Sequence, residues 1–500
     1  MNREQALAAL RDAREPWDLV IVGGGATGLG CAVDAAARGH RVVLVEQHDF
    51  AKGTSSRSTK LVHGGVRYLR QGHLPLVLGA LRERGLLCAN APHLVHRLAF
   101  IIPIYRWSDG PFYGLGLKLY DALSGQRSLG VSGRLSRSET LCHLPTLESA
   151  GLRGGVRYFD AQFDDARLAI DLAQTTFKLG GVALNYFQVV HFVKEGSRIC
   201  GVVARDQETG AEYEIRGRVV VNATGVFCDE LRKLDEPTAA RLVTPSQGAH
   251  LVLPKRFLPG DSALMIPRTS DGRVLFAVPW HDRVLVGTTD VPVAAASLEP
   301  RPLAEEIDFL LTNASEYLNP RPARYDVLSV FAGLRPLVKS GTETSTARLS
   351  RDHTLVVSEA GLLTITGGKW TTYRKMAEDT INRAEQLAGL NPQPCRTTQL
   401  PIRGTDATDL HANPELSAPL HPDLPYSDAD VVRAVRHEMA RTVEDVLARR
   451  TRALPLDARA SVAAAPRVAQ LMAAELGRDE TWQRQSLLDF NALARGWMLE

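Results

Sequence analysis

The pattern of hydrophobic and polar positions predicts a strand, a helix and a second strand within the first fifty residues. Residues 19–22 are a continuous apolar run that ends at a glycine cluster, as is typical of a strand buried on both faces. Residues 26–38 are rich in alanine and lack proline, which favours a helix. Residues 41–45 form a second buried run. This order is that of a parallel βαβ unit.

Short apolar runs alternate with turns between residues 247 and 290, which suggests an antiparallel sheet set against the first unit. Helical spacing is found at residues 74–89 and again from about 371 to 387. Strands are expected at residues 199–205, 218–222, 249–253, 273–278, 284–287 and 362–366.

The last hundred residues differ from the rest. A loop rich in proline and polar residues, 400–426, leads to Ser427, which with Asp430 has the spacing of a capping box. Apolar residues then recur at three or four positions, which predicts one amphipathic helix through Val432, Val435, Met439, Val443 and Val446. The remainder, rich in alanine and arginine, is also expected to be helical, and we interpret it as a cap that carries no chemistry.

Composition narrows the class of protein. Five hundred residues exceed what one hydrophobic core usually supports, so two or three domains are expected. A net charge of +3 is too small to indicate nucleic-acid binding, although it is compatible with contact to an anionic membrane surface. The six cysteines contain no C-x-x-C pair and are interpreted as reduced thiols of a cytoplasmic protein. The first 17 residues resemble no signal peptide, and we expect no bilayer-spanning segment.

The glycine cluster after the first strand carries the clearest chemical signal. Gly23, Gly25 and Gly28 have the G-x-G-x-x-G spacing, and Glu46 follows Gly28 by 18 residues at the end of the second strand. The first glycine permits the tight turn, the second lets the backbone approach a pyrophosphate, and the third lets helix and strand pack closely. Glu46 is placed to accept hydrogen bonds from ribose hydroxyls. This arrangement predicts a dinucleotide site; the alternative is a turn used only for packing.

Three further segments concentrate polar groups. Residues 54–69 hold hydroxyls, cations and a double glycine, which suits a loop along phosphates and a ring system better than a solvated loop. Arg335 lies between apolar neighbours, where it could bind an anion or pair with a core carboxylate. Lys369 follows a strand and a double glycine at a helix start, so it would favour negative charge on whatever it faces.

Taken in order, these motifs resemble the FAD-dependent glycerol-3-phosphate dehydrogenases of the respiratory, quinone-linked type. The resemblance covers nearly all 500 residues. It rests on the glycine turn and on residues 54–69, 222–225, 248–250, 287–290, 333–336, 367–374 and 442–452.

The resemblance implies an α/β fold like that of D-amino-acid oxidases: a Rossmann-like FAD-binding domain, an antiparallel β substrate domain and a helical C-terminal cap. The oxidoreductase unit would span residues 1–390, with the substrate sheet mainly in 241–350, and the helical domain 391–500. It also implies peripheral attachment to the inner, cytoplasmic face of the cell membrane and electron delivery to a quinone there. Residues 107–123 could dip into the membrane interface or form a core helix. Whether the chain forms a homodimer stays open.

The resemblance also assigns residues to the cofactor. The expected FAD contacts are Gly23, Gly25, Gly28, Glu46, Thr54, Ser55, Ser56, Thr59, Lys60, Leu61, Gly64, Val189, Gly225, Gly368, Lys369 and Thr371.

The implied substrate is sn-glycerol 3-phosphate, oxidised at C2 to dihydroxyacetone phosphate by hydride transfer to FAD. Arginine binds phosphate oxygens bidentately, so Arg67, Arg335 and Arg351 are candidate phosphate ligands, with Tyr68 as a hydroxyl donor.

The same reaction needs a base and a stabiliser of negative charge. His250 or His63 could take the hydroxyl proton near neutral pH. Lys369 and the helix beginning near Thr371 could stabilise charge on the reduced flavin. Thr288 is a candidate neighbour of substrate or flavin, or simply a turn at a strand end.

Three other functions are considered. An oxidase that passes electrons to oxygen would bind the same substrate, but lacks support because an insertion typical of family oxidases is not seen here. An amino-acid or amine oxidase would need about one arginine, whereas this chain offers several cations. A non-catalytic flavoprotein would not need a phosphate-binding cation cluster.

Overall fold

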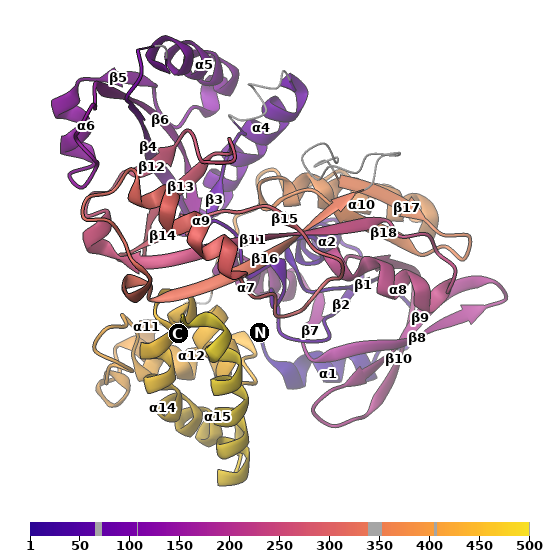
Figure 1. Ribbon diagram of the computed structural model, residues 1–500. Coiled ribbons are helices and arrows are strands. Elements are labelled where there is room, and N and C mark those ends of the chain that lie inside the picture. Colours follow the sequence, from indigo (N-terminus) through magenta and orange to yellow (C-terminus); the bar gives the residue numbers. More distant parts are fainter. Residues whose placement is uncertain (66–72, 108, 339–352, 405–407, 500) are drawn as a thin grey trace.

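The structure is a computed structural model that describes residues 1–65, 73–107, 109–338, 353–404 and 408–499. Figure 1 shows an α/β region on the right, a second sheet with its helices at the upper left, and a bundle of C-terminal helices below them. Both chain ends lie where these parts meet, and the Met1 ammonium donates to the carbonyl oxygen of His437 at 3.0 Å. Within the described ranges, no helix has both the length and the apolar composition needed to cross a bilayer.

The α/β region is built on a mainly parallel sheet. β1 lies between β2 and β10, β7 pairs with β2 and β18 with β10, all in parallel, while β17 adds an antiparallel edge. Leu19, Val20 and Ile21 have no exposed surface, as the continuous apolar run predicts. The strands are β1 (Trp17–Val22), β2 (Val42–Val45), β7 (Val182–Leu184), β8 (Phe187–Glu195), β9 (Arg198–Asp206), β10 (Glu212–Asn222), β17 (His353–Val357) and β18 (Leu363–Gly367).

Helices cover this sheet, and α2 packs between α7 and α10. Its alanine and glycine residues allow the close contact: Gly30 lies against the ring of Tyr373 on α10. The helices of the region are α1 (Arg3–Arg11), α2 (Ala26–Ala37), α7 (Asp165–Lys178), α8 (Cys228–Asp235) and α10 (Tyr373–Ala388).

The second sheet is mostly antiparallel, with one parallel pair between β12 and β4. It draws strands from residues 61–163 as well as from the expected 241–350. Its strands are β3 (Leu61–Val62), β4 (Val95–Ile104), β5 (Gly133–Leu135), β6 (Gly154–Phe163), β11 (Val243–Pro254), β12 (Ala263–Ile266), β13 (Leu275–Trp280), β14 (Arg283–Gly287), β15 (Val291–Pro292) and β16 (Ser329–Val338). The nearby helices are α4 (Leu74–Asn90), α5 (Asp109–Ser124), α6 (Arg137–His143) and α9 (Ala304–Ser315).

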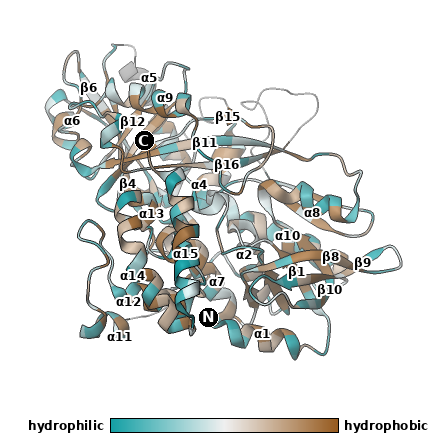
Figure 2. Ribbon diagram, turned by 60° about the horizontal axis from the view of Figure 1, so that its bottom comes forward, coloured by the Kyte–Doolittle hydropathy of each residue, from teal (hydrophilic) through white to brown (hydrophobic). Residues whose placement is uncertain are grey.

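Strand β11 contributes side chains to two hydrophobic cores. Leu251 and Leu253 join a core that includes residues of α9, whereas Val252 joins the core of the C-terminal helices. Alternate residues of a strand point to opposite faces, so His250 lies on the same face as Val252. The turned view in Figure 2 shows the C-terminal helices alongside this sheet.

The C-terminal part contains α11 (Thr408–His411), α12 (Asp428–Glu438), a π-helix (Asp445–Arg450), α13 (Ala453–Leu456), α14 (Ala458–Leu476) and α15 (Glu480–Ala494). The Ser427 capping box is confirmed. The expected single helix through Val446 is wrong, because α12 ends at Glu438 and Met439 has a φ of +53°. The Asp445 carboxylate accepts from the backbone N–H of Arg441 at 2.7 Å, which starts a new helical segment.

Candidate active site

The glycine turn after β1 requires glycine for steric reasons. Gly23 has a φ of +114°, and a Cβ there would lie 2.6 Å from the carbonyl oxygen of Ala223. A Cβ on Gly28 would lie 1.9 Å from the carbonyl oxygen of Gly23, so helix α2 touches the turn. The N-terminus of α2 therefore opens directly at the end of β1, with Gly25 as its N-cap.

A cavity of about 370 Å³ lies beside this turn, and its wall includes Gly25, Glu46, Val189 and Gly225. Glu46 lies directly after β2, and its carboxylate accepts from the N–H groups of Gly24 at 2.6 Å and His48 at 2.8 Å. Burial raises the pKa of Glu46, against the effect of these two donors. A helix N-terminus and an acid after the second strand fit the diphosphate and a ribose of FAD.

A second cavity, of about 890 Å³, meets the first at shared wall residues Thr54, Pro336, Gly368, Lys369 and Trp370. Its wall is formed by the loop after Gly53, by β11 and β16, and by the turn after β18. A ligand with two joined halves could thus extend from one cavity into the other. The predicted residues His63, Leu61, Thr288 and Thr371 also line this second cavity.

His250 is a buried side chain at the wall of the second cavity. It is 2% exposed and stacks on Phe331, with the ring centroids 4.8 Å apart. Its Nε2 lies 2.9 Å from the hydroxyl of Thr59. Burial holds the pKa of His250 well below its usual value, and the charges of Lys60 and Arg335 lower it further. The imidazole is therefore neutral at neutral pH and able to accept a proton.

Arg335 reaches the same cavity from β16, which runs antiparallel to β11 with Arg335 opposite Ser246. Its guanidinium donates to the hydroxyl of Thr288 at 3.2 Å and lies 3.4 Å from the carboxylate of Asp290. The sequence left open whether Arg335 binds an anion or pairs with a carboxylate. The structure shows the carboxylate pair and a position at the cavity wall together.

The turn after β18 brings the third predicted cation to both cavities. Gly368 has a φ of +68°, and Lys369 follows it at the wall that the two cavities share. Trp370 then donates its indole N–H to the carbonyl oxygen of Ser55 at 2.9 Å, which ties this turn to the loop after Gly53. Helix α10 begins at Tyr373, two residues later than predicted.

Three of the predicted cofactor contacts lie elsewhere. Lys60 lines neither cavity: its ammonium lies 2.7 Å from the Asp165 carboxylate, and burial lowers its pKa to about 8. The Ser56 hydroxyl faces the carbonyl oxygen of Gly53, while its own carbonyl accepts from Lys60. Gly64 donates its N–H to the hydroxyl of Tyr120 at 2.8 Å. The assignment of these three residues to FAD stays a prediction, and the groups named here have partners within the chain.

The predicted substrate ligands Arg67, Tyr68 and Arg351 lie outside the described residues. Two residues that sequence reasoning did not single out also belong to the site. Arg57 lines the large cavity and pairs with Glu299 at 2.6 Å. Asp290 lines the large cavity as well. It is the last residue of the motif 287–290, so the motif could have indicated this residue from the sequence.

Comparison with known proteins agrees with this geometry. Residues 18–374 match the FAD dependent oxidoreductase family DAO, and residues 404–483 match the C-terminal domain of alpha-glycerophosphate oxidase. The chain is thus an FAD-dependent oxidoreductase, and FAD is its cofactor.

Closer relatives define the family more narrowly. The chain is 38% identical to the mitochondrial glycerol-3-phosphate dehydrogenase of Homo sapiens over 540 residues, covering 97% of this chain and 74% of that protein. It is 39% identical to the mitochondrial glycerol-3-phosphate dehydrogenase SDP6 of Arabidopsis thaliana, covering 97% and 87%. The X-ray structure of the glycerol-3-phosphate dehydrogenase from Bacillus halodurans complexed with FAD matches with a TM-score of 0.78 at 29% identity, covering 99% and 97%. The chain belongs to the FAD-dependent glycerol-3-phosphate dehydrogenase family.

Proposed function

We propose that this protein oxidises sn-glycerol 3-phosphate at C2 to dihydroxyacetone phosphate and passes the two electrons to a quinone. The observation that carries the first half is the pairing of β11 with β16, which sets a neutral, buried imidazole (His250) and a fixed guanidinium (Arg335) at the wall of one cavity. A secondary alcohol that carries a dianionic phosphate needs both groups.

FAD, when bound, supplies the two-electron oxidant that accepts the C2 hydrogen as hydride. The residues of the chain have the other tasks. His250 accepts the hydroxyl proton, and its contact with Thr59 fixes the ring orientation. Arg335, held by Thr288 and Asp290, presents donors to the phosphate without first having to be ordered. Lys369 adds positive charge where the two cavities meet.

The shape of the large cavity supports a quinone as electron acceptor. Besides its polar wall it has an apolar one, formed by residues of β4, α5, β6, β12 and β13: Phe100, Leu117, Leu119, Tyr158, Met265 and Phe276. Glycerol 3-phosphate has no apolar group to fill such a wall. Leu119 is 48% exposed, so this wall reaches the protein surface at α5. An apolar ring could approach the site from there.

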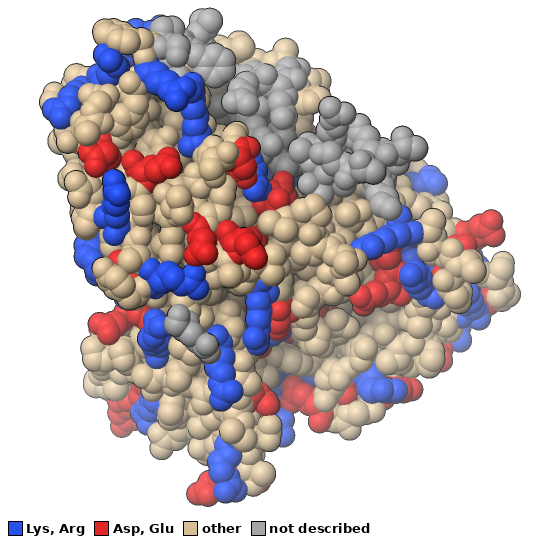
Figure 3. Space-filling view, in the orientation of Figure 1, with Lys and Arg blue, Asp and Glu red and all other residues tan. Residues whose placement is uncertain are grey.

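The same surface supports peripheral attachment to the inner, cytoplasmic face of the cell membrane. Leu74 and Leu78 of α4, Trp107 before α5 and Leu119 are all more than two-fifths exposed. Helices α4 and α5 lie together at the top of Figure 1, and Lys and Arg side chains gather at the upper left of Figure 3. Exposed apolar residues near cations suit a surface that contacts anionic lipid.

The test is anaerobic reduction of the purified holoprotein with glycerol 3-phosphate. Loss of the yellow flavin absorbance, followed by reoxidation with a soluble quinone faster than with air, is the expected result. Rapid recovery in air with release of hydrogen peroxide would instead make the protein an oxidase. No loss of absorbance with FAD bound would contradict the substrate, and amino acids and amines would be tried next.

A further inference from the structure

Residues 49–60 contribute to the walls of both cavities, and the C-terminal domain holds this segment at several points. Ala51 to Ser55 line the smaller cavity, and Thr54 and Arg57 to Thr59 line the larger. We call residues 49–60 the cofactor loop. Three nearly consecutive arginines of the C-terminal domain, each at most 2% exposed, reach it: Arg449, Arg450 and Arg452.

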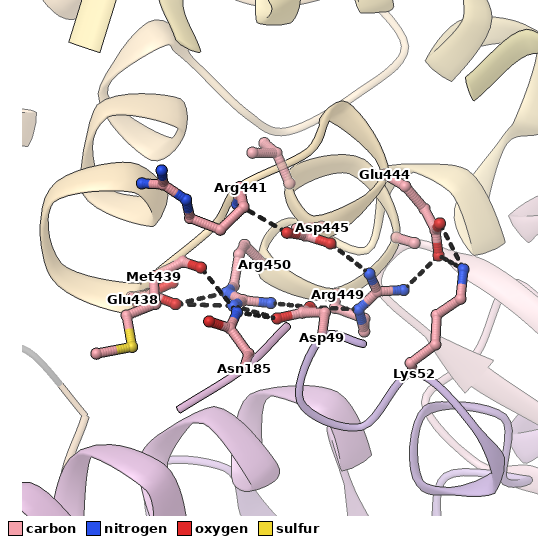
Figure 4. A network of polar contacts seen from close by, with 12 residues as sticks. Asp49, Lys52, Asn185, Glu438, Met439, Arg441, Glu444, Asp445, Arg449 and Arg450 are labelled. Carbon is pink, nitrogen blue, oxygen red and sulfur yellow. Dashed lines mark hydrogen bonds and ion pairs between the residues drawn. The ribbon is translucent and has the colours of Figure 1, made fainter. Parts of the chain in front are cut away.

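The first fixed point is Asp49, which has no exposed surface. Arg450 binds its carboxylate through both terminal nitrogens, one of them at 2.8 Å, and Arg449 donates to it through Nε. Figure 4 shows both guanidinium groups converging on this one carboxylate from the C-terminal side. These charges hold the pKa of Asp49 far below its usual value.

The second fixed point is Lys52, whose ammonium contacts the carboxylate of Glu444 (Figure 4) and lies 2.7 Å from that of Glu299. The third is the carbonyl oxygen of Ser56, which accepts from Arg452 at 3.0 Å. Arg452 also lies 3.0 Å from Asp165, the partner of Lys60.

The local backbone conformation places the side chains of these arginines against the cofactor loop. Asp445–Arg450 is a π-helix, a rare form that is frequently found at functional sites, and Arg452 has a φ of +67°.

The loop in turn contacts the groups expected to hold FAD. The Ser55 hydroxyl accepts from the N–H of Ala26, in the first turn of α2, at 2.9 Å. The Ser55 carbonyl accepts from Trp370 at the junction of the cavities. A displacement of the loop would therefore move both the helix terminus that faces the diphosphate and the turn that carries Lys369.

Adhesion between the domains does not require this network. The C-terminal helices already share an apolar core with the second sheet through Val252, Trp280, Leu285 and Phe331. Burying several charges costs desolvation energy, and apolar residues of similar volume are often at least as stabilising. In some proteins, buried polar or charged groups instead fix one arrangement of the packed elements.

We propose that the C-terminal domain completes the FAD site: Glu444, Arg449, Arg450 and Arg452 are positioning residues that set the conformation of the cofactor loop. The ligand they serve is FAD itself, through residues 52–59, and none of the four lines either of the two cavities.

The chain offers a matched pair of variants for the test. Glu444 and Glu475 have side-chain exposures of 17% and 18%, and each accepts from an arginine of the C-terminal domain. Glu444 also binds Lys52 of the loop, whereas the partner of Glu475 is Arg436, away from the loop. E444Q and E475Q thus make the same change in two places that differ in the contact to the loop.

FAD is removed from the full-length protein, and its dissociation constant is measured from quenching of flavin fluorescence as FAD rebinds. We expect E444Q to raise the constant about tenfold, the usual effect of losing one charge-assisted contact, and E475Q to leave it within about twofold. R450K, which keeps the charge but not the bidentate geometry, should also weaken FAD binding.

Equal FAD affinity in E444Q and wild type, or an equal loss in E475Q, would overturn the proposal. If R450K fails to fold, the E444Q and E475Q pair still decides, because each glutamine keeps an oxygen that accepts hydrogen bonds. The readout is independent of substrate, so it is not affected if glycerol 3-phosphate proves to be the wrong substrate.

Discussion

At His250, burial decides the protonation state before any substrate is present. The pKa is held well below 6.5, so the imidazole stays neutral as the pH falls through the range where an exposed histidine becomes charged. We predict that the limiting rate of flavin reduction by glycerol 3-phosphate stays constant as the pH falls from 8 through about 6.5, where an exposed histidine titrates, and declines only at lower pH. Anaerobic stopped-flow measurements check this, and an apparent pKa of 6.5 or above would assign the proton to another group.

The burial of His250 also makes the stability of the folded protein depend on pH. In the unfolded chain the imidazole takes up a proton below about pH 6.5. The folded state does not take up this proton, so the stability of the folded protein should decrease as the pH decreases in that region. His250→Asn removes both effects and should slow flavin reduction by about 10²–10⁴-fold with FAD still bound. His281→Asn, a half-exposed histidine outside both cavities that pairs with Asp164, should leave the rate unchanged.

At the scale of elements, the sequence predicts best where a local steric rule operates. The β1–α2–β2 unit follows from apolar runs and three glycines, and the expected helix at residues 74–89 is α4, Leu74–Asn90. The break after Glu438 was missed, because the apolar spacing continues through Met439 and Val443 while the backbone does not. The Asp445 carboxylate accepts hydrogen bonds from the backbone N–H groups of Arg441 and Thr442, and these bonds outweigh the apolar periodicity there. The spacing of apolar residues does not reveal such bonds.

The second prediction concerns the contact between α2 and the glycine turn. Gly28→Ala would place a Cβ 1.9 Å from the carbonyl oxygen of Gly23, so the helix must move away from the turn. We expect a loss of about 1–3 kcal/mol in unfolding free energy, as for an overpacked core, together with loss of bound FAD.

The control is Gly79→Ala in α4, where a Cβ meets open space. It should stabilise the protein by about 0.5–1 kcal/mol, because alanine is the better helix former. Denaturant unfolding and the flavin absorbance per chain report both quantities.

Helix α5 gives the third prediction, which tests an alternative that the sequence left open. Leu117 and Tyr120 are 1% exposed and Leu119 is 48% exposed, so one face of the helix is core and another is surface. If that surface contacts lipid, Leu119→Glu should reduce co-sedimentation with anionic vesicles. Leu488→Glu, at a leucine of α15 that is 65% exposed, is the control; α5 and α15 lie at opposite ends of the molecule in Figure 1. Equal loss of binding in the two variants, or none in either, would contradict membrane contact through α5.

At the scale of the whole molecule, the sequence could not have shown how the C-terminal domain meets the FAD site. Asp49 and Arg450 are 401 residues apart, and each alone is an ordinary charged residue. The arginines 449, 450 and 452 had been interpreted as part of a cap without chemistry. Only the fold brings Arg449 and Arg450 to the carboxylate of Asp49 and Arg452 to the carbonyl oxygen of Ser56, because spacing rules describe neighbours along the chain and not across a domain boundary.

This contact also makes the last prediction, since coupling between two sites acts in both directions. If the C-terminal domain fixes the cofactor loop for FAD, bound FAD must in turn stabilise the contacts of Arg449, Arg450 and Arg452. Hydrogen exchange of the backbone amides at residues 445–452 should therefore slow when FAD binds, although these residues line neither FAD cavity. The surface turn at residues 477–480, between α14 and α15, should exchange equally with and without FAD and serves as the internal control. Slower exchange confined to residues 22–60, with residues 445–452 unchanged, would mean that the network joins the domains without sensing the cofactor. In E444Q the effect of FAD on residues 445–452 should be smaller than in wild type, because the bond between Glu444 and Lys52 is part of the path.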